Sequence, residues 1–286
     1  MKARDLQLVQ ALLLAMGIIL LSVTQGCKKK EKENPDVSLF QEAAEDNARA
    51  EGEQNFLSDA VDNQGETSDP RRVAGTDSAF LPPCARVSYD ANTRRLTIDF
   101  GPTNCLCRDG VYRRGKVYVT FSGPQWLTAG SRAYVTTDSF FVNDNQHIVE
   151  KILFNEGINQ AGERVIRDTV QLHKVITPNG THQWSATRTY RQIQGQSTWM
   201  RWDDIWLIEG NAQGTTRRGN SYTIQILSPL KVVGSCIFRV PVKGIWQLNT
   251  QNRTVKVNYD PYNNEACDRV ASVQVDNQNP VNITLR

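Results

Sequence analysis

Alternation of apolar and polar residues recurs along most of the chain after residue 95. It is clearest in five runs, which are Leu96–Phe100, Val117–Phe121, Tyr222–Ile226, Val255–Tyr259 and Val281–Leu285. A period of two places successive side chains on opposite faces of a strand, and this is typical of antiparallel sheets with one buried face. Residues 81–286 contain no convincing helical period, so the pattern predicts an all-β domain.

Turn signals separate these runs. Pro178-Asn179-Gly180 lies between the apolar stretches 164–177 and 181–191, and Asn-Gly is the strongest short hairpin signal. About a dozen strands joined by such turns predict an antiparallel meander. A meander of this size folds into a sandwich or a partly closed barrel, and the sequence does not separate the two.

The first residues have the layout of an export signal. Lys2 and Arg4 precede the apolar run Leu8–Val23, which is short for a membrane span of ~20 residues and ends at Gly26-Cys27. This end resembles a relaxed bacterial lipobox of the Bacteroidota kind. We expect residues 1–26 to be a lipoprotein signal peptide and Cys27 to be lipidated. An uncleaved signal anchor is the alternative.

Charge divides the remaining chain into two parts. Residues 28–79 hold 7 Lys and Arg against 13 Asp and Glu, whereas residues 80–286 hold 24 against 16. We expect 27–80 to be a lipidated acidic tether with a short amphipathic helix within 37–62, and 81–286 to be the β domain. The basic residues of the domain are scattered and accompany no nucleic-acid motif, so they indicate solvated surface.

With Cys27 lipidated, five cysteines remain, and export favours disulfides among them. Two similar blocks, each a strand followed by a hairpin return, predict the pairs Cys84–Cys105 and Cys236–Cys267 and leave Cys107 unpaired. Cys84–Cys107 stays open as a rival, because connectivity does not follow from sequence. Cys105-Leu106-Cys107 has the wrong spacing for a zinc knuckle, so no metal site is predicted.

The chain carries no recognisable catalytic motif. His147, His173 and His182 are the only histidines, and there is no nucleophile elbow, phosphate-binding loop or metalloprotease motif. Asp203 and Asp204 are conspicuous, but neighbouring strand residues point to opposite faces. No catalytic residue, cofactor or nucleic-acid partner is therefore predicted.

One short feature could bind a carbohydrate, and another could carry one as a modification. Trp199 and Trp202, in the stretch 199–206, could present an aromatic platform to a glycan, although tryptophans that close the core of the sheet explain the same residues. Asp77-Ser78-Ala79 and Asp168-Thr169-Val170 resemble O-glycosylation sites of exported Bacteroidota proteins. Ser78 lies in an expected linker and Thr169 in the middle of an expected strand.

Longer motifs resemble an uncharacterised group of exported Bacteroidota lipoproteins, over both the tether and the β domain. These motifs are Cys84–Val87, Thr97–Gly101, Cys105, Asp109-Gly110, Arg114–Val117, Thr187–Thr189, Gly210–Ala212 and Cys267-Asp268. The resemblance implies a lipoprotein with a β-rich exported domain, and it implies no activity.

We therefore expect an outer-membrane lipoprotein that faces either the periplasm or the cell surface. Its partners would be the membrane, through the N-terminal lipid, and a glycan, an envelope protein or a lipid bound by the β domain. A structural or assembly role without a soluble ligand is the first alternative, and a hydrolase is the second. The latter would need a pocket with convergent polar groups.

Overall fold

The computed structural model describes residues 35–67, 81–123, 125–198, 201–236 and 240–284. The chain divides into two compact units, Met1–Val37 and Ser38–Arg286, and the second unit contains every strand and nearly all of the helix. The expected signal peptide, Cys27 and Ser78 lie outside the described residues.

The described chain contains one long helix, one 3₁₀ turn and fourteen strands. The helix is α2 (Pro35–Thr67) and the turn is η1 (Arg201–Asp203). The strands are β1 (Arg86–Asp90), β2 (Arg95–Asp99), β3 (Cys105–Leu106), β4 (Tyr112–Phe121), β5 (Arg132–Val142), β6 (Asn145–Ile158), β7 (Arg164–Thr177), β8 (Gly180–Gln194), β9 (Ile205–Thr215), β10 (Ser221–Val233), β11 (Lys243–Asn249), β12 (Thr254–Asn258), β13 (Val270–Val275) and β14 (Val281–Thr284).

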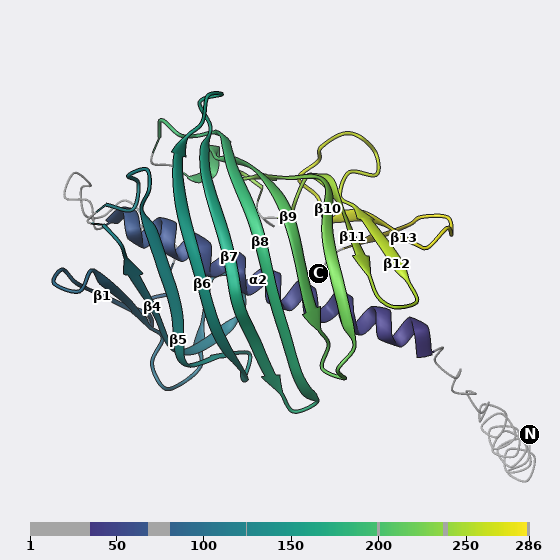
Figure 1. Cartoon of the computed structure of the whole chain (residues 1–286), viewed down its shortest axis with the longest axis horizontal. Helices are drawn as coiled ribbons and strands as arrows, with labels where there is room; N and C mark the ends of the chain where they lie inside the picture. Colours follow the sequence, from purple (N-terminus) through teal and green to yellow (C-terminus); the bar gives the residue numbers. More distant parts are fainter. Residues whose placement is uncertain (1–34, 68–80, 124, 199–200, 237–239, 285–286) are drawn as a thin grey trace, which may run out of the picture. The chain divides into compact units, whose positions relative to one another are not determined.

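All fourteen strands belong to one antiparallel sheet (Figure 1). Apart from β3, which pairs with β4, the strands follow one another across the sheet in chain order. Thr177 pairs with Gly180 across the turn at Pro178-Asn179, as the Asn-Gly signal predicts. The all-β class and the antiparallel meander are thus confirmed. The strands form a single sheet that is not closed, so a two-sheet sandwich is not formed.

Helix α2 runs across one face of this sheet (Figure 1). The helix expected within 37–62 is present, but it is longer than expected and is not part of a tether, since α2 has 33 residues and contacts the sheet through buried side chains. Its buried apolar residues are mostly small, and they alternate with buried polar ones such as Glu53 and Gln54. A helix that buries carboxylates and amides leaves almost no hydrophobic period to detect. For this reason the sequence pattern predicted only a short helix within 37–62.

The core consists of two clusters on the helix-bearing face. The first joins Leu57, Ala60 and Val61 of α2 to buried residues of β2, β4, β5 and β6. The second joins Ala43 and Ala50 of α2 to buried residues of β7 to β13. Successive parts of the helix thus pack on successive parts of the sheet.

Both disulfides form with the predicted connectivity. Cys84 is bonded to Cys105 and Cys236 to Cys267, and the rival Cys84–Cys107 bridge is absent. Cys107 is a buried free thiol, and burial raises its pKa. The first bridge ties the start of the domain to β3, and the second ties the segment after β10 to the segment before β13.

Candidate functional site

A buried ion pair joins the middle of α2 to the sheet. The Arg113 guanidinium on β4 donates to both carboxylate oxygens of Glu53, and the shortest distance is 2.8 Å. It also contacts Asp109 at 2.9 Å and lies 3.5 Å from the centre of the Phe56 ring. Because the side chains of both Arg113 and Glu53 are almost fully buried, each charge depends on the other for compensation.

One turn further along α2, Ser58 contacts a second buried pair. Lys151 on β6 lies 2.8 Å from Asp168 on β7, and its Nζ donates to Ser58 Oγ at 2.7 Å. A serine beside a lysine is an arrangement that activates some nucleophiles. Here Lys151 is an ammonium paired with a carboxylate, and an ammonium has no lone pair to accept the Ser58 proton. Lys151 therefore does not activate Ser58. The Ser58 hydroxyl donates to the Gln54 carbonyl at 2.9 Å and to Asp168 Oδ2 at 3.1 Å, so the serine links α2 to the ion pair on the sheet.

All three histidines are buried under the middle of α2. His173 Nε2 and His147 Nδ1 are 2.9 Å apart, and His173 Nδ1 is 3.0 Å from the Gln54 amide. His182 Nε2 is 2.8 Å from the Tyr222 hydroxyl. Burial lowers the pKa of His147 to about 3 and that of His182 to about 4, and it lowers the pKa of His173 as well. The imidazoles are neutral at physiological pH. No three His, Cys, Asp or Glu side chains in the described part of the chain are arranged to hold a metal ion.

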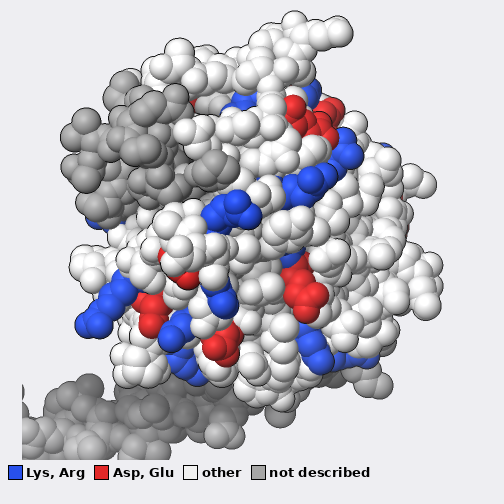
Figure 2. All heavy atoms as spheres, turned by 60° about the vertical axis from the view of Figure 1, so that its left-hand side comes forward, with Lys and Arg blue, Asp and Glu red and all other residues white. Residues whose placement is uncertain are grey.

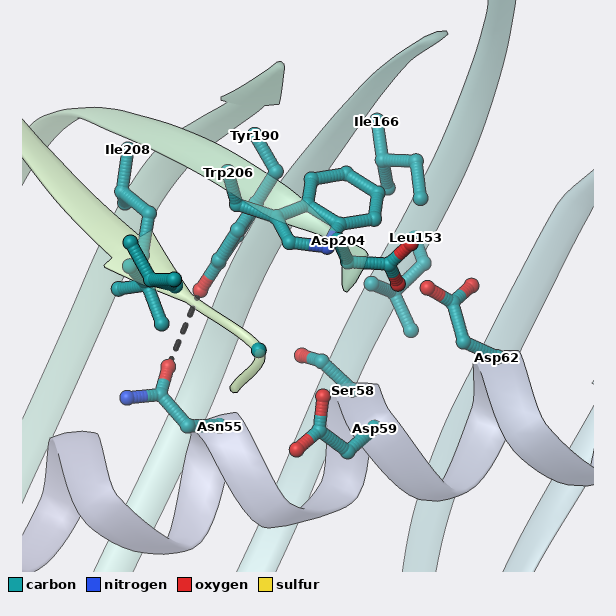
Figure 3. A pocket seen from close by; sticks show the side chains of 13 residues that line it. Asn55, Ser58, Asp59, Asp62, Leu153, Ile166, Tyr190, Asp204, Trp206 and Ile208 are labelled. Carbon is teal, nitrogen blue, oxygen red and sulfur yellow. Dashed lines mark hydrogen bonds between the residues drawn. The ribbon is translucent and has the colours of Figure 1, made fainter. Parts of the chain in front are cut away.

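A cavity of about 130 Å³ lies between α2 and strands β6 to β10 (Figure 3). Thirteen residues line it. Its apolar wall comes from β6, β7, β9 and β10, and includes Leu153, Ile166, Ile208 and Val232. Figure 3 shows Ser58 and Asp59 directed from α2 toward the space, with Trp206 and Tyr190 on the opposite side.

Polar groups converge on this cavity from both the helix and the sheet. Asn55, Ser58, Asp59 and Asp62 come from α2, and Tyr190 and Asp204 come from the sheet side. The Tyr190 hydroxyl donates to Asn55 Oδ1 at 3.2 Å. Burial, followed by the charge of Asp168, raises the Tyr190 pKa well above its usual value, so this hydroxyl stays a neutral donor.

Two of the carboxylates are held by direct contacts. Asp62 Oδ1 accepts from Trp126 Nε1 at 2.6 Å and from Arg164 at 3.3 Å. Asp204 Oδ1 accepts from Gln192 Nε2 at 2.8 Å. A Cβ on Gly195 would lie 2.2 Å from Asp204 Oδ1, so only glycine leaves room for the carboxylate in this position.

A second hollow, of about 350 Å³, shares Asp62, Asp204 and Trp206 with the cavity. Its other lining residues include Asn155, Arg164 and the segment 195–198. The shared residues therefore stand between two adjoining spaces.

The expected glycan platform is only partly described. Trp202 is 60% exposed, and it lies in η1 rather than on a strand. The strand geometry assumed for Asp203 and Asp204 is therefore wrong, because Asp203 belongs to η1 and β9 begins only at Ile205. Trp206 is partly buried and lines the cavity, whereas Trp199 lies outside the described residues.

The possible O-glycosylation residue Thr169 lies in the middle of β7 and is half-buried. Its neighbour Asp168 is almost fully buried in the ion pair with Lys151. A glycosyltransferase would have to open the strand to reach this position.

Basic side chains are intermixed with acidic ones on the face that Figure 2 shows. Arg95 stacks on Tyr118, and Arg132 on Phe154, while Lys116 pairs with Asp99 at 3.5 Å. A surface of mixed charge with its cations stacked or paired favours the interpretation as solvated surface.

Sequence reasoning missed most of the cavity residues. Asp59 and Asp62 fell within the expected tether, Tyr190 within an expected strand, and Asp204 counted only as half of an adjacent acid pair. The available signal was the spacing of four residues from Asn55 to Asp59 and of three from Asp59 to Asp62, which places these polar groups near one face of a helix.

The fold and its cavity thus define a class of protein: a single open antiparallel sheet with one face covered by a helix, and a small ligand-sized space between them. Comparisons of the chain with models of known families, with curated proteins and with solved structures found no match. Within the described residues, no helix combines the length and the apolar character needed to cross a membrane.

Proposed function

We propose that the protein is a lipid-anchored component of the cell envelope whose β domain binds a small ligand in the cavity between α2 and strands β6 to β10. The observation that carries the proposal is the cavity itself. It is an apolar concavity on which a few polar groups from two different elements converge, and this combination is what small-molecule sites share. The protein is proposed to act by binding rather than by catalysis.

Support for the envelope location comes from the chain's beginning and its cysteines. The run before Cys27 has the layout of a lipoprotein signal, and the two disulfides fit an oxidising compartment. Mass spectrometry of the mature N-terminal peptide tests the anchor, and an intact Met1–Gly26 segment would contradict it. Protease shaving of intact cells then separates a surface-facing domain from a periplasmic one in the outer membrane.

The cavity proposal is tested by filling the space. Ile208→Trp adds a large ring to the cavity wall, and Ile176→Trp adds the same ring at an exposed position of β7 outside the cavity. Ligand-detected NMR with a library of small polar fragments should show hits that Ile208→Trp abolishes and Ile176→Trp keeps. Hits that survive Ile208→Trp, or a library with none, would contradict the proposal.

A glycan is the ligand class that the exposed Trp202 favours. Its ring lies in η1, directly before β9, which carries Trp206. Trp202→Ala should reduce binding on a glycan array without changing the melting temperature, because the side chain is 60% exposed. Unchanged array binding would remove the glycan as a ligand class and leave the cavity proposal to the fragment screen.

A structural or assembly role is the second candidate. All residues of β1 and β14 are exposed, and each strand lies at one end of the sheet. A free edge is a template for pairing with another strand. Analytical ultracentrifugation of the purified chain tests this role, since a monomer at all concentrations would oppose self-assembly through the edges.

A hydrolase has less support. Ser58 lines the cavity and accepts from Lys151 Nζ, while its own hydroxyl donates to Asp168 Oδ2 at 3.1 Å. A general base must accept the nucleophile's proton; the Lys151 ammonium cannot do so, and the Asp168 carboxylate is held in the ion pair with Lys151.

A further inference from the structure

Strand β1 ends the sheet with its core-facing side chains exposed. It lies at one end of the strand order, and among the described strands it pairs with β2 alone (Figure 1). Val87 and Tyr89 share a face with their neighbours across the pair, Ile98 and Leu96 of β2. Those two neighbours are 1% and 2% exposed, whereas Val87 and Tyr89 are 42% and 39% exposed. The apolar face of the sheet therefore continues onto a strand that leaves it open to solvent.

The opposite face of β1 carries a charge at each end of the strand. Arg86 and Asp90 are both exposed, and neither forms an ion pair within the described residues. Asp99, which lies opposite Arg86 on β2, pairs with Lys116 instead. Arg95, which lies opposite Asp90, stacks on an aromatic ring of β4. The strand thus presents one cation and one anion at its open edge.

The five residues of β1 are self-complementary in an antiparallel pair. Opposed residues of a sheet must point to the same face, so the register between two copies of β1 changes in steps of two residues. Only the register centred on Ser88 pairs every residue, and any other register shortens the ladder. In this register Arg86 lies opposite Asp90 of the second copy, Val87 lies opposite Tyr89, and Ser88 lies opposite Ser88.

Each of these pairs is of a kind that stabilises antiparallel sheets. Opposite charges, an aromatic ring beside a β-branched residue, and two hydroxyls are favourable cross-strand neighbours. The two-fold symmetry makes the first two kinds of pair occur twice. Hydrogen bonds from the Thr93 side chain and the Asn92 backbone hold the pKa of Asp90 below its usual value, so this carboxylate is charged at neutral pH. The second copy would also cover the exposed sides of Val87 and Tyr89.

The other end of the sheet lacks this property. Strand β14 has four residues and no charge among them. Full overlap of two β14 strands would place Val281 opposite Thr284, and these two residues point to opposite faces. A pair of β1 with β14 would leave Arg86 and Asp90 opposite uncharged residues, and such head-to-tail contacts need not close. The charge pattern therefore favours a second copy of β1 as the occupant of this edge.

We infer that two copies of this chain associate through β1 as a closed, two-fold symmetric dimer, in the antiparallel register that places Ser88 opposite Ser88. The inference rests on the assembly role proposed above, because it names the edge and the register of that assembly. It does not depend on the cavity. A pairing of this length is short for a specific interface, so the dimer is weak in solution. A shared membrane anchor would favour it by raising the local concentration of the two copies.

Ser88→Cys tests the register directly, because the symmetry axis brings residue 88 of both copies together. Opposed residues of an antiparallel pair have Cα atoms about 4.5–5.5 Å apart, a separation that a disulfide spans. Air oxidation of the purified full chain should therefore give a covalent dimer on non-reducing gels. Asn282→Cys places a thiol at an exposed position of β14, and it should stay monomeric. The wild type carries every native cysteine and reports the background.

Charge reversal measures what the ends of β1 contribute. Arg86→Glu creates two like-charge pairs in the dimer, and it should raise the dissociation constant about tenfold in analytical ultracentrifugation. Asp90→Lys should do the same, and the combination of both substitutions should restore the wild-type constant. Lys256→Glu reverses an exposed charge on β12 and should change nothing. If Asp90→Lys fails to fold, Arg86→Glu and Ser88→Cys still test the dimer.

The outcomes distinguish the inference from the assembly role on which it rests. Association that Arg86→Glu leaves unchanged, with no cross-link in Ser88→Cys, would overturn the β1 dimer and leave assembly through another surface. A cross-link that requires both Ser88→Cys and Asn282→Cys would overturn the closed dimer and show head-to-tail pairing of β1 with β14. A chain that is monomeric at all concentrations and gives no cross-link would remove the dimer and the assembly role together.

Discussion

The two halves of α2 meet the sheet in different ways. From residue 42 to 51, the buried apolar residues are alanines, and contacts with the sheet are mostly polar: Arg217 pairs with Asp46 at 2.9 Å, Arg188 with Glu51 at 3.0 Å, and Trp184 donates to Asn47. From residue 53 onward, larger side chains, Leu57 and Val61, join the first core cluster. One half is fixed by charge and the other half also by apolar packing.

The cavity lies under the second half of α2. In the first half the buried apolar side chains are alanines, and ion pairs satisfy the polar groups around them. Under the second half, the buried side chains are larger and carboxylates stand on the same turns as apolar residues, as with Asp59 beside Ala60. Packing such mixed turns against a curved sheet leaves a space. The candidate site therefore belongs to the half in which packing does most to hold the helix.

Acidification should lower the free energy of unfolding more than any substitution below, because the buried histidines lie at the junction of the two halves of α2. His147 and His173 lie between Phe140 of the first cluster and Trp184 of the second. Burial holds their pKa values, and that of His182, below the unfolded value near 6.5. Between pH 6.5 and about 4 the unfolded chain binds more protons, so the free energy of unfolding falls as the pH falls. The slope is about 1.4 kcal/mol per pH unit for each histidine.

Other charges around the histidines do not reverse this sign. Arg49, Arg113 and Lys151 disfavour further positive charge there. Burial raises the pKa of Glu53, so this group makes the opposite contribution, gaining stability as the pH falls. Urea unfolding at pH 7, 6 and 5 measures the net change in the free energy of unfolding, and NMR titration of the histidine resonances identifies which imidazoles stay neutral. A constant unfolding free energy, or an imidazolium signal in the folded protein at pH 6, would contradict the prediction.

Glu53→Ala should be the most damaging single substitution in the second half. It leaves the Arg113 guanidinium buried with only Asp109 as a carboxylate partner, and breaking a buried pair in this way costs about 3–5 kcal/mol. Urea unfolding at pH 7 measures the loss. Replacing both residues by leucine should recover most of it, because no charge is then left behind. Glu45→Ala is the control, since this half-exposed carboxylate contributes at most about 1 kcal/mol.

The strands and the presence of a helix within 37–62 could be predicted from the sequence, but the length of the helix and its packing on the sheet could not. Ile98 and Val117 alternate with polar residues because the outer face of β2 and β4 meets water. The other face carries apolar residues in these strands, and the alternation is strong. On β6 to β8 the inner face also carries Lys151, His173 and Arg188, and on α2 it carries their partners. Only the three-dimensional pairing shows that these charges are buried.

The disulfides were predictable because they close local hairpins. Cys84 and Cys105 flank β1 and β2, so the bridge depends on contacts near in sequence. The cavity depends on Asp59, Tyr190 and Asp204, and Asp59 lies more than a hundred residues before the other two. They come together only because α2 crosses the sheet. A pattern read along the chain cannot contain that juxtaposition.

Leu57→Ala should lower the free energy of unfolding, because the second half of α2 is held partly by apolar packing. Leu57 is 1% exposed within the first cluster, and large-to-small substitutions at such positions cost about 2–5 kcal/mol. Ala50→Gly in the first half removes the corresponding buried methyl group, and it should cost only about 1 kcal/mol, mainly through helix propensity. Thermal and urea unfolding of the two variants compare the halves directly. Equal losses would show that the halves are not held differently.

Of the four predicted losses of stability, that of Arg217→Ala should be the smallest, although Arg217 makes several of the polar contacts in the first half of α2. Asp46 keeps one partner after the substitution, because the backbone N–H of residue 217 donates to its Oδ2 at 3.0 Å. Only the guanidinium of this pair is partly exposed, since the Asp46 side chain is 0% exposed; with the backbone bond kept, the loss is about 1–2 kcal/mol. Salt should also distinguish the two halves, because raising the ionic strength from about 0.05 to about 1 M shortens the screening length to about 3 Å. The difference in free energy of unfolding between wild type and Arg217→Ala should then become smaller, while the difference between wild type and Leu57→Ala stays constant. If the loss for Arg217→Ala matches that for Glu53→Ala and does not respond to salt, the first half is packed as tightly as the second, and the cavity needs another explanation.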